Sequence, residues 1–185
     1  MKIKMFLPCC CIFLLIITLR AFSQNEDYLY QNWPGKGTDA KRGISVSDNL
    51  VEGYKLSLAK GYNDNSVFYR MPLNDSDTSR KGRLQLRIYP NPSEAQLALT
   101  DYLNSLTFVD KPQRMDNDDL KYADVAFGME YNNIFRIAYT KNNVFVVIHA
   151  TNGHAILLAE EIANTIANAS AWNPGDQKPH LIFTK

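Results

Sequence analysis

Three histidines are the residues of this chain best suited to proton transfer or metal binding. His149 and His154 are separated by the pair Asn152-Gly153, which predicts a turn between a strand and a helix. Histidines that bind one metal from a single helix face are spaced four residues apart, and His180 is the only other imidazole. We therefore expect His149 on the outer face of a sheet, His154 at the start of a helix, and no metal or other cofactor in the protein.

Catalytic motifs are scarce in the rest of the sequence. It contains no G-x-S-x-G nucleophile motif, no phosphate-binding glycine loop and no dinucleotide-binding glycine motif. All three cysteines, Cys9, Cys10 and Cys11, precede the segment that we expect to fold. The enzymatic alternative is therefore a small hydrolase in which His149 or His154 works with a nearby carboxylate, with or without metal assistance.

A different hypothesis comes from one face of a predicted sheet. Strand residues alternate between two faces, so the apolar set that faces the core leaves a second set on the opposite face. That second set mixes basic and apolar side chains: Arg83, Gln85, Arg87, Arg136, Phe145, Val147 and His149. Cations beside exposed aromatic and aliphatic groups suit an anionic or amphipathic ligand. The candidate ligand-binding residues are Arg83, Arg87, Arg136, Phe145 and His149.

The same face has a plainer interpretation as the solvated side of an antiparallel sheet. Phe145 and Val147 argue against full exposure, because apolar residues there require a cover: a partner, a ligand, or the N-terminal arm with Trp33. We therefore predict a non-enzymatic binding domain whose partner is a protein or an anionic or amphipathic ligand. Without residues 1–23 the chain would have 17 basic and 19 acidic residues, and a net charge of about −2 gives no reason to expect nucleic acid or an anionic membrane as that partner.

The N-terminal segment predicts export. Two lysines precede an apolar run over residues 5–19, and the small-residue sequence Ala21-Phe22-Ser23 follows it. This order is typical of a secretory signal peptide, residues 1–23, that is cleaved after Ser23. The run is shorter than the roughly 20 apolar residues of a membrane span and contains Pro8, and an uncleaved anchor is the alternative. We expect a secreted or periplasmic protein without a membrane span after cleavage.

The mature chain has the length of one domain. Cleavage would leave about 160 residues, enough to bury a core without disulfides. Residues 24–49 are polar and rich in turn formers, which predicts an irregular arm held by Trp33 and by Tyr28 or Tyr30. Residues 50–185 are expected to form the single folded domain.

The apolar periodicity of this domain predicts strands and helices in a repeated order. Alternation with period two indicates strands near residues 53–60, 67–71, 83–89, 125–128, 133–139 and 144–150, with an edge strand at 181–183. Apolar residues at helical spacing indicate helices near 92–106 and 154–169. Asn91, Pro92 and Glu94 supply the cap, first position and capping-box acid of the first helix.

Strands followed by a helix, twice over, predict the fold class. We expect an α+β protein with an antiparallel sheet built from hairpins and two helices packed on one face. The strand at 144–150 is apolar on both of its faces, which places it in the middle of the sheet.

Overall fold

The computed structural model describes residues 26–28, 33, 39–47, 57–62, 66–70, 82–107, 111–116 and 120–184. The expected signal peptide, residues 1–23, lies outside the described residues. Within the described ranges, no helix is both long enough and apolar enough to cross a membrane.

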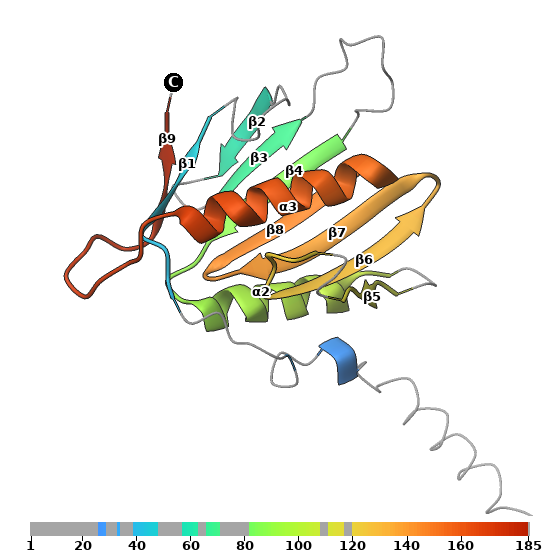
Figure 1. Ribbon diagram of the computed structural model, residues 1–185, viewed down its shortest axis with the longest axis horizontal. Coiled ribbons are helices and arrows are strands. Elements are labelled where there is room, and N and C mark those ends of the chain that lie inside the picture. Colours follow the sequence, from blue (N-terminus) through green and yellow to red (C-terminus); the bar gives the residue numbers. More distant parts are fainter. Residues whose placement is uncertain are drawn as a thin grey trace, which may run out of the picture.

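A seven-stranded antiparallel sheet forms the centre of the fold (Figure 1). Its strands run in the order β2-β3-β4-β8-β7-β6-β5, so the strand that is apolar on both faces, β8, is the middle one, as expected. The strands, in chain order, are β2 Ser57–Tyr62, β3 Ser66–Arg70, β4 Gly82–Ile88, β5 Gln113–Arg114, β6 Val125–Tyr131, β7 Ile134–Lys141 and β8 Val144–Thr151.

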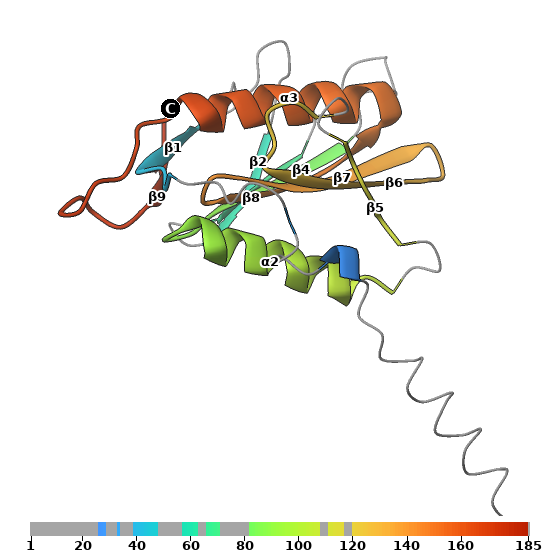
Figure 2. The same cartoon turned by 60° about the horizontal axis from the view of Figure 1, so that its bottom comes forward.

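Two helices cover opposite faces of this sheet, and Figure 2 shows α3 above it and α2 below it. Helix α3 (Asn152–Asn168) packs through Leu158 and Ile162 in one core cluster with Leu86, Ile137 and Val146. Helix α2 (Pro92–Ser105) packs in a second cluster with other sheet residues: Leu99 and Leu103 lie with Phe145 and Val147.

The α+β class, the hairpin-built antiparallel sheet and the order of strands then helix, twice, are confirmed. The expectation that both helices pack on one face is wrong. The physical reason is the composition of β8, whose two apolar faces each require a covering layer.

The start of α2 is set by the residues that predicted it. Asn91 Oδ1 accepts a hydrogen bond from the backbone N–H of Glu94 at 3.0 Å, and Asn91 Nδ2 donates to Glu94 Oε1 at 2.8 Å. Pro92 occupies the first helical position, where its missing N–H costs nothing. Helix α3 begins at Asn152, slightly before the expected start, and takes Gly153 into its first turn.

Beside the main sheet, β1 (Gly43–Val46) and β9 (His180–Phe183) form a small parallel sheet. The expected edge strand at the C-terminal end is therefore present, but its partner lies in the segment that was expected to be irregular. Ile44, Val46 and Leu181 are buried in the core cluster of α3. The core beneath α3 therefore continues from the main sheet into the small parallel sheet.

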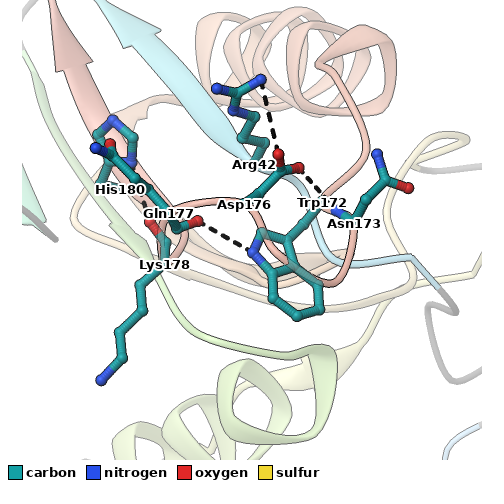
Figure 3. A network of polar contacts seen from close by, with 7 residues as sticks. All are labelled: Arg42, Trp172, Asn173, Asp176, Gln177, Lys178 and His180. Atoms are coloured by element: carbon teal, nitrogen blue, oxygen red, sulfur yellow. Dashed lines mark hydrogen bonds and ion pairs between the residues drawn. The ribbon is translucent and has the colours of Figure 1, made fainter.

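The loop between α3 and β9 is held by its own polar contacts (Figure 3). Pro174 and Gly175, with φ 103° at the glycine, form a turn closed by the N–H of Asp176 on the carbonyl of Asn173 at 3.0 Å. The carboxylate of Asp176 accepts from the N–H of Asn173 at 2.9 Å and lies 4.0 Å from Arg42. Trp172 Nε1 donates to the carbonyl of Gln177 at 3.0 Å, which closes the loop.

Asn143, at the β7–β8 turn, ties the N-terminal segment to the sheet. Its buried side chain accepts from the N–H of Lys41 at 2.6 Å and donates to the carbonyls of Lys41 and Tyr89 at 3.1 and 2.7 Å. Lys41 Nζ donates to the carbonyl of Ala167 at 2.9 Å, in the last turn of α3, where the helix dipole favours a cation. Residues far apart in the sequence are thus joined at one end of the sheet.

Candidate functional site

The candidate ligand-binding residues share the α2 face of the sheet. Arg83 of β4 is opposite His149 of β8, and His149 is opposite Arg136 of β7. Residues directly opposite in neighbouring antiparallel strands project from the same face. We call Arg83, His149 and Arg136 the basic row. Arg87 is opposite Phe145 on this face, as the alternation predicted.

Helix α2 covers the apolar part of this face. Phe145 is 6% exposed and Val147 is 4% exposed, and both pack with Leu99 and Leu103. The rings of Phe145 and Tyr102 have centroids 5.6 Å apart. Phe145 is therefore a core residue and not an exposed ligand contact, which corrects its expected role. The required cover is supplied mainly by a helix of the chain itself.

Tyr28 and Trp33 add to this cover, as the predicted arm suggested. Tyr28 (in η1, Glu26–Tyr28) meets the ring of Phe127 edge-on at 5.3 Å, and Trp33 lies 5.6 Å from the same ring. Tyr28 Oη donates to the carbonyl of Pro112 at 2.8 Å, so its buried hydroxyl is satisfied. Tyr30, the alternative contact, lies outside the described residues. Phe127 is buried beneath the two aromatic rings as a result.

The basic row lies outside the apolar contact of α2 with the sheet. Arg83 is exposed, and Arg136 and His149 are half-buried. The row follows the sheet register, so the three residues stand on adjacent strands about 4.8 Å apart, with His149 between the two arginines. The register therefore places one arginine on each side of His149, and both act electrostatically on its ring.

Electrostatics in the row keep His149 neutral. Its pKa is lowered from 6.5 to about 4, first because burial disfavours the charged ring and then because Arg136 and Arg83 repel it. No carboxylate is among these causes. A half-buried site with two permanent positive charges and an uncharged imidazole is suited to accept a negative group.

Tyr102 links α2 to the row. Its pKa is raised by burial, while Arg136, which donates a hydrogen bond to the phenol oxygen, opposes that rise. The sequence places Tyr102 only in the apolar stripe of the helix, so its polar contact was missed. The available signal was its hydroxyl, because a buried tyrosine usually has a hydrogen-bond partner.

Arg87 is separated from the row. It stands four residues along β4 from Arg83, about 13 Å away, and its guanidinium lies 4.9 Å from the centre of the Tyr89 ring. Arg87 therefore projects from the same sheet face as the basic row but lies opposite Phe145, away from His149. The structure thus brings together Arg83, Arg136 and His149 of the five candidates and separates Arg87 and Phe145 from them.

The histidines are not brought together. His149 lies on the α2 face, whereas His154 belongs to the first turn of α3, which packs on the opposite face. His180 is in β9, where its Nδ1 lies 3.0 Å from the carbonyl of Lys178 (Figure 3). Among the described residues, no group of three or more His, Cys, Asp or Glu side chains could hold a metal ion.

The sequence matches no protein-family model, and it has no significant match among curated proteins or solved structures.

Proposed function

We propose that the protein is a secreted or periplasmic binding domain without catalytic activity, and that the basic row holds an anionic group of its ligand or partner. The observation that carries this proposal is the position of His149 between Arg83 and Arg136 on adjacent strands. Export is proposed from residues 1–23, whose charge and apolar pattern is that of a signal peptide.

The electrostatic arrangement supports an anion in preference to a proton-transfer reaction. A general base needs a pKa near the working pH, and the pKa of His149 is held at about 4. A hydrolase would also orient this imidazole with a carboxylate, whereas the charges acting on it are two guanidinium groups. An anion would relieve the repulsion among these groups and accept hydrogen bonds from both arginines.

Isothermal titration calorimetry with inorganic phosphate tests the proposal. We expect Arg83→Glu to weaken phosphate binding by about tenfold or more, because it replaces one of the two attracting charges with a repelling one. Arg87→Glu is the matched control, since it makes the same charge change on the same strand about 13 Å away, beyond the Debye length of roughly 8 Å at physiological salt. Equal loss of binding in both variants, or no phosphate binding by the wild type, would contradict the proposed site.

A further inference from the structure

An exposed apolar pair lies next to the basic row, at the tip of the β6–β7 hairpin. Tyr131 is 62% exposed and Ile134 is 50% exposed, and they are opposite each other in the register. Asn132 and Asn133 form the two-residue turn between them, both with positive φ. We call Tyr131 and Ile134 the hairpin tip. Two large apolar side chains at the same tip are unusual in a turn region, which is ordinarily polar.

The hairpin tip and the basic row project from the same face. Ile134 precedes Arg136 by two residues in β7, and alternate residues of a strand share a face. In the same way Tyr131 follows Met129, which is opposite Arg136. The tip therefore begins about 7 Å from the row along the strand direction. Basic and apolar groups are adjacent on one surface, on the part of the face beyond Phe145 and Val147.

We infer that the basic row and the hairpin tip form one site for an anionic amphiphile, a small molecule with a single negative headgroup on an apolar chain. The headgroup accepts hydrogen bonds from Arg83 and Arg136 above His149, and the chain lies along Tyr131 and Ile134. This inference rests on the proposed anion site and adds the class of ligand. It combines two exposed features of this face among the described residues, the charge of the row and the apolar surface of the tip.

Charge and size favour a single molecule over a membrane surface. Without residues 1–23 the chain has a net charge of about −2, which does not attract an anionic bilayer over a distance. Among the described residues, the exposed apolar contact at this tip consists of two side chains, much less than the roughly 800 Å² that each partner buries in a stable protein interface. The two arginines provide enough charge for one anionic headgroup, and the apolar pair provides enough surface for one alkyl chain.

The test compares three soluble probes by calorimetry: inorganic phosphate, octyl phosphate below its micelle concentration, and octyl glucoside as a neutral amphiphile. We expect octyl phosphate to bind about tenfold more tightly than phosphate, the effect of removing on the order of 60 Å² of apolar surface from water. Octyl glucoside should bind more weakly than octyl phosphate, because it has no charge for the two arginines. Ile134→Ser and Tyr131→Ser should each reduce the advantage of octyl phosphate while leaving phosphate binding unchanged.

Leu157→Ser is the matched control, because Leu157 is 58% exposed but belongs to α3 on the opposite side of the sheet. This variant should still bind octyl phosphate about tenfold more tightly than phosphate. The inference is overturned if octyl phosphate binds no better than phosphate, if both tip variants keep the advantage, or if the protein binds only vesicles of phosphatidylglycerol. In the first two cases phosphate binding would still support the anion site, whereas absence of phosphate binding would remove the site itself.

Discussion

His149 shows how one residue's surroundings decide which chemistry it can perform. A histidine in a strand next to a helix turn could bind a metal, act as a base or line a binding face. Burial and two flanking arginines lower its pKa to about 4, so the ring is neutral at physiological pH. The two positively charged neighbours of His149 therefore favour anion binding at this position.

This pKa has a measurable effect on stability. The folded protein keeps the ring neutral down to about pH 4, whereas the unfolded chain protonates it near 6.5, so unfolding takes up a proton between these values. The contribution of His149 to stability is therefore lost as the pH falls from 6.5 to 4. Allowing for solvent screening of this half-exposed group, we expect a loss of about 1 to 2 kcal/mol.

Urea denaturation of the wild type and His149→Gln at several pH values measures this loss. Glutamine does not titrate, so the wild type should lose stability relative to the variant on acidification. A constant difference between the two proteins from neutral pH down to pH of about 4.5 would contradict the lowered pKa.

At the scale of elements, the sheet and helices were largely predictable, but their layering was not. The apolar stripe of α2, with its Asn91 cap, indicated a helix and its buried side, because helical spacing is a local property. A stripe does not specify which sheet face it meets. The apolar composition of both faces of β8 held that information, since a strand buried on both sides requires two covering layers.

The orientation of α2 gives a direct prediction. Leu99 is fully buried beneath the helix, whereas Leu97, two residues earlier, is 47% exposed. We expect Leu99→Ala to lower the free energy of unfolding by about 3 kcal/mol and Leu97→Ala by less than about 0.5 kcal/mol. Thermal or urea unfolding of the two variants measures the difference, and equal losses would show that α2 does not pack on this face.

The candidate site was predictable only in part, for a similar reason. Alternation placed Arg83, Arg136 and His149 on one face, and the register brought them to adjacent strands. Alternation could not separate Arg87 and Phe145 from them, because it gives the face of a residue and not its distance from a helix elsewhere in the sequence. The pairing of β1 with β9 was not predictable because it joins segments far apart in the sequence, such as Gly43 and His180.

At the scale of the whole molecule, the described residues form a sheet between two helices, with polar anchors at one end. Asn143 and Lys41 connect the N-terminal segment, the β7–β8 turn and the end of α3. Helices cover both faces of β8, and α2 also reaches the basic row through Tyr102, whereas the hairpin tip is exposed. The described residues contain no cysteine, so no disulfide adds to the packing among them.

Processing at the N-terminus is the prediction that concerns the chain as a whole. We expect the exported protein to begin at Gln24, because the small residues before it suit signal peptidase. Intact-mass measurement of the protein recovered from the periplasm or medium determines the first residue. Retention of residues 1–23 on a membrane-bound protein would support the anchor and contradict the proposed release.

The most direct test of the anion site is an NMR titration of the His149 ring at low ionic strength, with and without inorganic phosphate. Without phosphate, the ring should titrate at a pH of about 4. With phosphate, its pKa should rise, because an anion between Arg83 and Arg136 stabilises the protonated imidazole. The rise should persist in Arg87→Glu, which keeps the row intact. A His149 ring that titrates at the same pH with and without phosphate would contradict the proposed anion site.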